Sequence, residues 1–241
     1  MTNTTSELWL DRPIRLRPTF PDLDPAMVSG TLRATSRHAP DDTIDAQVER
    51  QLSRLKQVAK PACVYRLIDQ SEPDLDLCPT DMALERPSTE RSILLFAMTM
   101  GAEVDRLIRA EEIIRLDQAV ILDRCAVLGL SVLVDRIWEE LAERLSASGL
   151  YLSDRNFPGD PGFPLRAQTK ICDLLNSGRA IGLTVNSKSL FLEPLKSVTM
   201  LARTTGQRET GFRISMCETC GHNNDCPYRS AQKPEEGKTN E

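Results

Sequence analysis

Ile93-Leu94-Leu95-Phe96-Ala97-Met98-Thr99-Met100-Gly101-Ala102-Glu103-Val104 is the stretch of this 241-residue chain that decides its fold. It opens with a continuous apolar run, which is typical of a buried strand. The Thr-Met-Gly sequence that follows predicts a turn, and a helix is expected to begin near Ala102. Residues 111–147 are also helical in pattern, and their central part is apolar on most faces. We therefore expect a long helix buried in the core after this strand, turn and first helix.

Segments before this stretch predict two strands and a helix. Ile14-Arg15-Leu16 is a candidate short strand in a proline-rich segment. Helix signals begin at Asp41, apolar or small residues recur at helical spacing over residues 44–58, and Lys60-Pro61 ends the run. Residues 62–68 alternate well enough to predict a strand.

Segments after the long helix predict a further helix and several short strands. A helix is expected over residues 165–176, with Gly178 as its C-terminal stop. Short strands are expected at residues 181–185, 189–192, 198–202 and 212–215. The fold class that follows is α+β, a single domain with a twisted antiparallel sheet and a long central helix.

Composition divides the chain into four parts. Residues 1–26 carry four prolines and few periodic apolar positions, which predicts an extended N-terminal arm. Residues 27–215 form the main domain, and residues 216–230 hold a cluster of cysteines. Residues 231–241 are polar and are expected to be disordered.

Charge and hydropathy exclude some classes of partner. A net charge of -5 argues against general binding of nucleic acid, which usually needs a basic surface. No apolar signal-peptide core follows the polar residues 1–5. The longest apolar stretch, residues 119–134, is interrupted by Asp123 and Arg124 and is shorter than the roughly 20 residues of a spanning helix. We expect a cytoplasmic protein without a membrane anchor.

A cluster of cysteines near the C-terminus is the sharpest chemical signal. Its members are Cys217, Cys220 and Cys226. In a cytosolic chain this spacing suggests zinc or an iron–sulfur cluster, because thiolates three residues apart can hold one metal. A fourth ligand is missing from the pattern; His222, Cys172, Cys125 or another molecule are candidates. The alternatives are free thiols on a mobile tail and, more weakly, a catalytic disulfide between Cys217 and Cys220.

The loop at residues 154–164 is a second candidate site. It packs three prolines and two glycines between Pro158 and Pro164, which forbids a helix interior or a central strand. A stiff loop with free glycine amides, and with Arg155 at its mouth, suits an anionic or zwitterionic ligand. The alternative is an ordinary turn before a helix, with a surface arginine beside it.

The order of these motifs resembles the activation domain of cobalamin-dependent methionine synthase. The resemblance rests first on Arg155-x-x-Pro158-Gly159, a following helix, and Ile181-Gly182-Leu183-Thr184. The Pro194-to-Val198 segment then falls where that domain has a proline and a Ser-Val element. Thr99 to Val104 matches the turn that this family has before its long helix. Two more segments resemble free-standing bacterial relatives of the domain: Lys60-Pro61 to Tyr65-Arg66, and Cys226-Pro227-Tyr228-Arg229. The similarity spans roughly residues 27–229.

The resemblance implies a C-shaped domain that binds S-adenosylmethionine in a groove. Arg155 would hold the ligand carboxylate, with Pro158, Gly159 and Asp160 nearby. Such a domain meets a cobalamin domain whose cofactor has become oxidised; an electron reduces the cobalt, and the methyl group of S-adenosylmethionine restores methylcobalamin. No catalytic or cobalamin-binding domain is recognisable in this chain. The expected partners are therefore a corrinoid protein or methionine synthase core on a separate chain, and an electron donor.

Two departures from the family pattern favour a different function. Asp160 stands where the family usually has tyrosine, and Lys188 lies where a Thr-Glu-Ser run is usual. Both changes would weaken or retune the binding of S-adenosylmethionine. The alternative is a metal-dependent redox or scaffold protein with a vestigial groove, and a third, weaker possibility is a regulatory module that senses corrinoid or S-adenosylmethionine without chemistry.

Overall fold

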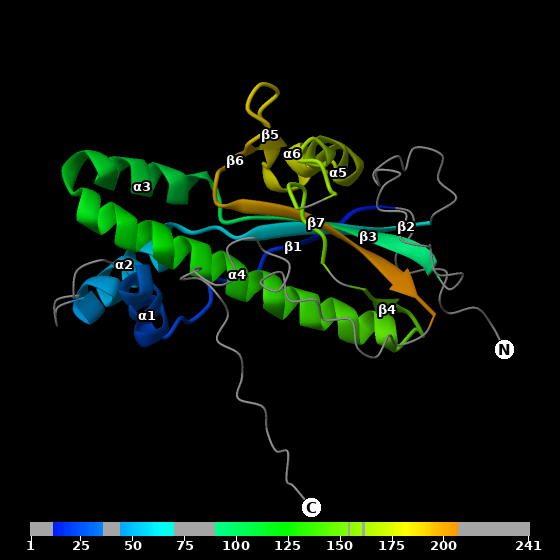
Figure 1. Cartoon of the computed structure of the whole chain (residues 1–241), viewed down its shortest axis with the longest axis horizontal. Coiled ribbons are helices and arrows are strands. Elements are labelled where there is room, and N and C mark those ends of the chain that lie inside the picture. The colour runs from blue at the N-terminus through cyan, green and yellow to red at the C-terminus, as the bar shows by residue number, and fades with distance from the viewer. Residues whose placement is uncertain (1–11, 36–43, 70–89, 154, 161, 207–241) are drawn as a thin grey trace, which may run out of the picture.

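A five-stranded antiparallel sheet forms the centre of the molecule (Figure 1). The structure is a computed structural model that describes residues 12–35, 44–69, 90–153, 155–160 and 162–206. In spatial order the strands are β1 (Ile14–Leu16), β2 (Ala62–Asp69), β3 (Glu90–Thr99), β7 (Ser197–Thr205) and β4 (Tyr151–Leu152). Three of the predicted strands, over residues 14–16, 62–68 and 198–202, are confirmed, and β3 contains the apolar run of the deciding stretch.

Two hydrophobic cores lie on opposite faces of this sheet. Because successive side chains of a strand point to opposite faces, β3 supplies both cores. Its buried side chains divide into Leu94, Phe96 and Met98 for the first core and Ile93, Leu95 and Ala97 for the second. β3 is thus the buried strand that the apolar run predicts.

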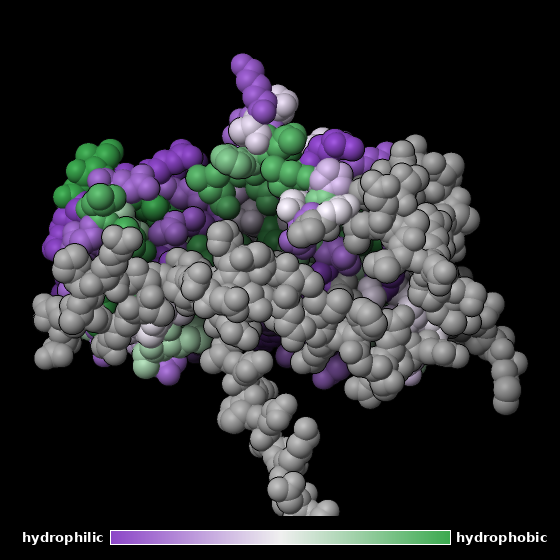
Figure 2. Space-filling view, viewed as in Figure 1, coloured by the Kyte–Doolittle hydropathy of each residue, from purple (hydrophilic) through white to green (hydrophobic). Residues whose placement is uncertain are grey.

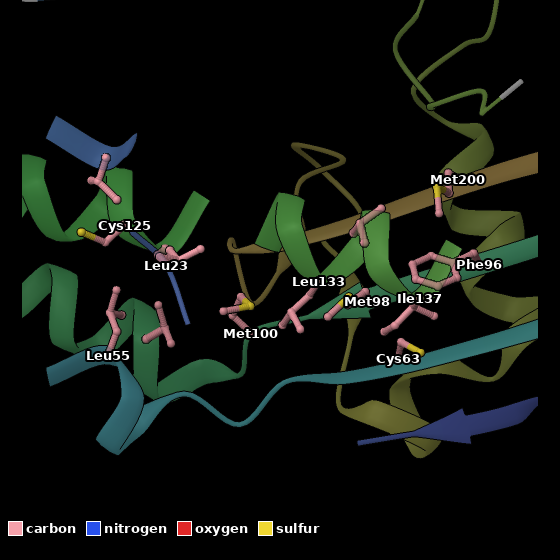
Figure 3. Packing of buried hydrophobic residues seen from close by; sticks show 14 of the residues in the cluster. Leu23, Leu55, Cys63, Phe96, Met98, Met100, Cys125, Leu133, Ile137 and Met200 are labelled. Atoms are coloured by element: carbon pink, nitrogen blue, oxygen red, sulfur yellow. The ribbon is translucent and has the colours of Figure 1, made fainter. Parts of the chain in front are cut away.

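The first core is covered by the long helix α4 (Leu116–Ser146), which runs along the sheet (Figure 1). Helices α2 (Ile44–Val58) and α3 (Ala102–Ile114) pack against α4, and α1 (Pro25–Thr35) packs against α2 and α4. Figure 3 shows Leu133 and Ile137 of α4 beside Met98 and Phe96 of β3. The α+β class with a long central helix is confirmed.

The second core is covered by a smaller layer on the opposite face. It consists of α5 (Ala167–Leu175), α6 (Ser177–Ile181) and a two-stranded sheet of β5 (Thr184–Val185) and β6 (Leu192–Glu193). Ile171 and Leu175 of α5 are fully buried against β2, β3 and β7. In Figure 1 this layer lies above the sheet.

The long helix begins later than the sequence predicts. Residues 111–114 belong to α3, and the chain turns at Arg115, whose extended backbone (φ -150°, ψ 94°) separates the two helices. The apolar side chains at this corner are solvent-exposed, with Ile113 at 87% and Ile114 at 73%. Figure 2 shows apolar surface over this end of α3. Their apolar character suggested a continuous buried helix, so the expected start at residue 111 is wrong.

Three other expectations about elements need correction. The helix over residues 165–176 ends at Asn176, which is left-handed (φ 49°), and Gly178 lies inside α6 instead of stopping α5. The strands expected at 181–185 and 189–192 reduce to β5 and β6. Helix α1 had no counterpart in the sequence analysis. The strand expected at 212–215 lies outside the described residues.

The extended segment before α1 packs against α4 at a glycine. An added Cβ atom at Gly129 would meet the Phe20 ring atoms Cε2 at 2.8 Å and Cζ at 2.9 Å. Lys56 of α2 forms an ion pair of 2.5 Å with Asp22, and Leu23 is buried in the first core. Gly129 therefore allows this segment to approach α4 closely.

We predict that Gly129→Ala lowers the free energy of unfolding by about 1–3 kcal/mol, because the new methyl group overpacks the space that Phe20 fills. Denaturant titration measures the change. Gly30→Ala is the matched control, since its Cβ would meet nothing within 4 Å. Replacing this exposed helical glycine is expected to stabilise the protein by roughly 1 kcal/mol. Equal effects of the two substitutions would contradict the contact between Phe20 and Gly129.

Candidate functional site

Arg155 lies between the end of β4 and the long helix. Its guanidinium forms an ion pair with the carboxylate of Asp135 on α4. It also lies 5.7 Å from the ring centroid of Trp138, one helical turn further along α4, in the range of a cation–π contact. The Arg155 side chain is 34% exposed, and that of Asp135 is 55% exposed. The Arg155 side chain, which the sequence suggested as an anion-binding group, is thus partly exposed to solvent and pairs with a carboxylate of the same chain.

Asn156 fixes the start of the loop to the sheet. Its N–H donates to the Leu201 carbonyl at 2.9 Å, and its carbonyl accepts from the Leu201 N–H at 3.0 Å. Phe157 packs against the first core, whereas Phe163 is 2% exposed and belongs to the second core. The loop therefore crosses the edge of the sheet from one core to the other.

Hydrogen bonds within the loop use the amide of Gly159, which was expected to be free, and the carboxylate of Asp160. The Gly159 N–H donates to the Phe163 carbonyl at 2.7 Å, so the expected free amide at this glycine is wrong. Asp160 accepts from the Phe157 N–H through Oδ2 at 2.9 Å, and its own N–H donates to the Phe157 carbonyl at 2.9 Å. Asp160 therefore has a structural role in the turn. Gly159 adopts φ 105°, a backbone conformation that favours glycine.

Among the described residues, β7 is only partly paired on the side that faces the loop, and it carries two unpaired hydroxyls on the face of the second core. β7 pairs with β3 along its length, but on its other side it pairs with β4 and Asn156 only from Leu201 to Thr205 in the described part of the chain. The hydroxyls Ser197 Oγ and Thr199 Oγ1 are buried and make no hydrogen bond to any residue that the structure describes. Such buried groups favour a ligand or water that can pair with them. The sequence predicts a strand here, over residues 198–202, but it does not indicate that these two hydroxyls lack partners.

The turn of the deciding stretch joins three strands. The Met100 N–H donates to the Lys196 carbonyl at 2.8 Å, and the Met100 carbonyl accepts from the Lys60 N–H at 3.0 Å. Gly101 adopts φ 93° here, and a Cβ would lie 3.3 Å from the Lys60 carbonyl oxygen. The Lys196 side chain forms an ion pair of 2.5 Å with Asp123 on α4. β7 therefore starts from a position that is held by β3 and by the long helix.

The predicted metal ligands Cys217, Cys220 and Cys226, together with His222, lie outside the described residues. Two candidate fourth ligands are described: Cys125 in the first core and Cys172 in the second. Burial raises the pKa of the Cys125 thiol to about 12 and raises that of Cys172 as well, which disfavours the thiolate that a metal needs.

The described residues contain neither a metal-binding cluster nor a membrane-spanning helix. Among them, no group of three His, Cys, Asp or Glu side chains is arranged to hold a metal ion. No helix in this part of the chain has the length and apolarity needed to cross a bilayer.

A comparison with solved structures finds the MetH reactivation domain in a crystal structure with AdoHcy bound. The TM-score is 0.53 at 13% sequence identity, and the match covers 83% of this chain and 80% of that one. At this identity the likeness shows a common fold, in agreement with the fold that the sequence resemblance implies. No protein-family model and no curated protein matches the chain.

We predict that Asp160→Ala speeds hydrogen exchange of the Phe157 amide, because it removes the acceptor of that N–H. The loss of one such hydrogen bond is expected to cost about 1 kcal/mol, or roughly five-fold in the local opening equilibrium. Amide exchange followed by NMR measures it. Asp160→Asn keeps an acceptor oxygen and should leave the exchange rate close to that of the unchanged chain. Unaltered exchange in Asp160→Ala would refute the structural role of this carboxylate.

Proposed function

We propose that this protein binds S-adenosylmethionine beside Arg155 and supports the reductive remethylation of a corrinoid protein on another chain. The observation that carries the proposal is the common fold with a reactivation domain that was solved with AdoHcy bound. The placement of Arg155 supports it, since this side chain lies at an accessible point where the loop meets α4 and the sheet edge.

The ion pair between Arg155 and Asp135 is the starting state for ligand binding. An exposed pair of this kind contributes about 0–1 kcal/mol, so the cost of opening it is small. The carboxylate of an amino-acid ligand would replace that of Asp135 and pair with the guanidinium in a bidentate manner. Asp135 would then turn to water, which its exposed position allows.

Another group of the site would orient the rest of the ligand. Trp138 offers an aromatic face beside Arg155, and aromatic faces attract cations such as a sulfonium. When bound, S-adenosylmethionine supplies the methyl group. The residues of this chain would bind and orient it, and the corrinoid and its electron donor would belong to partners.

We predict that Arg155→Ala weakens S-adenosylmethionine binding by about ten- to a hundred-fold, the usual cost of a lost hydrogen bond to a charged group. Asp135→Asn should instead tighten binding a few-fold, because it removes the internal competitor for the guanidinium. Isothermal titration calorimetry with S-adenosylmethionine and with AdoHcy measures both effects.

Arg136→Ala is the matched control for this prediction. It removes an exposed arginine of α4 whose partner is Glu140, at 3.7 Å, and it should leave affinity unchanged. No binding to the unchanged chain would reject the ligand. The reaction itself is tested by transfer of a labelled methyl group from S-adenosylmethionine to a methionine synthase core supplied as a separate chain, under reducing conditions.

A metal-dependent redox or scaffold protein is the second candidate function. The specific observation in its favour is that Arg155, Gly159 and Asp160 already have partners within the protein. A groove whose polar groups are engaged in this way is consistent with one that no longer binds a ligand.

We predict that protein purified anaerobically carries a metal held by Cys217, Cys220 and Cys226, because clustered thiolates bind zinc or iron–sulfur clusters. Metal analysis and absorption spectroscopy measure it. A broad iron–sulfur band would support a redox role, and one equivalent of zinc a structural one. Replacing all three cysteines with serine should remove the metal, whereas Cys63→Ser, at a buried position of β2, serves as the control. Metal-free protein would reject this second function.

A further inference from the structure

A cleft of about 440 Å³ lies between α3 and the corner that joins β6 to β7. Its volume is in the range of small-molecule sites, roughly 300–1,000 Å³. It shares no lining residue with the loop that carries Arg155. The lining residues are Ala102, Asp105, Arg106, Arg109, Gly182, Glu193, Pro194 and Leu195.

Two arginines form one wall of this cleft. Arg106 and Arg109 are three residues apart on α3, so they lie on the same face of the helix. Among the described residues, the Arg109 side chain has no hydrogen-bond or ion-pair partner. Arg106 has only a 3.5 Å ion pair with Glu103, which also lies 3.6 Å from Lys60. An exposed pair of this length contributes little and leaves the guanidinium available.

Both acidic side chains of the cleft already have partners. Asp105, which is 8% exposed, accepts from the backbone N–H of Leu195 at 2.6 Å and from that of Lys196 at 3.4 Å. Glu193 accepts from the Asn186 amide at 2.9 Å. Both carboxylates therefore accept from donors of the protein, while neither guanidinium has a strong partner in the part of the chain that the structure describes.

The rest of the lining is apolar and open. Pro194 and Leu195 face the arginine wall, and Leu195 is 49% exposed. Gly182 adopts φ 71°, and a Cβ there would meet nothing within 4 Å, so the space next to this glycine is open. Figure 2 shows hydrophilic surface over α3 next to apolar surface around β6. The cleft thus combines two cationic groups with a small apolar surface.

We propose that this cleft is a second binding site, for a small anion that carries an apolar body. Arg106 and Arg109 hold its phosphate or carboxylate group, for which guanidinium pairs are suited. Pro194 and Leu195 contact the apolar body. The proposal is independent of the site at Arg155, because the two share no residue.

Titration with three probes tests the proposal: phenyl phosphate, benzoate and inorganic phosphate. NMR chemical-shift titration of the full chain gives the affinities. We expect at least one of the two aromatic probes to bind more tightly than inorganic phosphate. The tighter-binding of the two, phenyl phosphate or benzoate, identifies the preferred anionic group. If neither aromatic probe binds the unchanged chain, the proposal is overturned.

Substitutions then locate the site. Arg106→Gln with Arg109→Gln should weaken the bound aromatic probe at least ten-fold, as the loss of charge-assisted hydrogen bonds predicts. The matched control, Arg50→Gln with Arg136→Gln, removes the same charge from exposed positions of α2 and α4. It should leave affinity within about two-fold, since neither arginine lines the cleft and exposed charges are screened by salt. Equal losses in the two double variants, or no loss in either, would overturn the proposal.

A third variant tests the apolar contact. Leu195→Ala should weaken the aromatic probe several-fold while leaving inorganic phosphate unaffected, because the leucine touches only the apolar body. The backbone N–H of residue 195 still donates to Asp105, so the corner keeps its hydrogen bond. Equal affinity of the aromatic probe for Leu195→Ala and for the unchanged chain would contradict the proposed orientation. Calorimetry with S-adenosylmethionine on the Arg106/Arg109 variant should be unchanged, which separates this result from the test at Arg155.

Discussion

The backbone of Met100 holds the ends of three strands together. Its N–H and carbonyl bond to Lys196 and Lys60, which fixes the start of β7 and the approach to β2 against the end of β3. Asp105, one turn into α3, then binds the backbone N–H groups of the residues that precede β7. Buried backbone groups need such partners, so this turn determines where β7 begins and how α3 leaves the sheet.

The two candidate sites both depend on where β7 lies. At its start, the corner held by Asp105 forms one side of the cleft lined by Arg106 and Arg109. Further along, pairing with Leu201 places the loop that carries Arg155 against α4. The position of β7 therefore sets the position of both arginine-containing sites, although the arginines belong to α3 and to the loop.

Local patterns predicted most of the fold but not its corners. Alternation identified β2, a continuous apolar run identified β3, which is buried on both faces, and helical spacing identified the helix over residues 44–58. The turn at Arg115 escaped prediction, since Ile113 and Ile114 are apolar yet exposed. Helix α1 escaped because its apolar pattern is weak and Gly30 lies within it, while Pro25, at its first position, belongs to the proline-rich segment predicted to be an extended arm.

The candidate site was predictable only in part, for a similar reason. Arg155 stood out because of the prolines and glycines that follow it. Its partners Asp135 and Trp138 belong to α4, and Asp135 lies 20 residues before it in sequence. They meet Arg155 only through tertiary packing. The hydrogen bond from the Phe157 N–H to the Asp160 carboxylate joins residues three apart in sequence. Aspartate is common in turns for this reason, so this contact could have been predicted from the sequence.

The crossing of the sheet edge by this loop has a consequence for how the molecule opens. Phe157 is packed in the first core and Phe163 in the second, with only a short turn between them. Because the chain from Phe157 to Phe163 links the two layers, we expect that neither layer can move away from the sheet without displacing the other. We therefore expect the two layers to behave as one cooperative unit in native-state hydrogen exchange. A ligand seated on the loop would then protect amides in both layers by the same free energy.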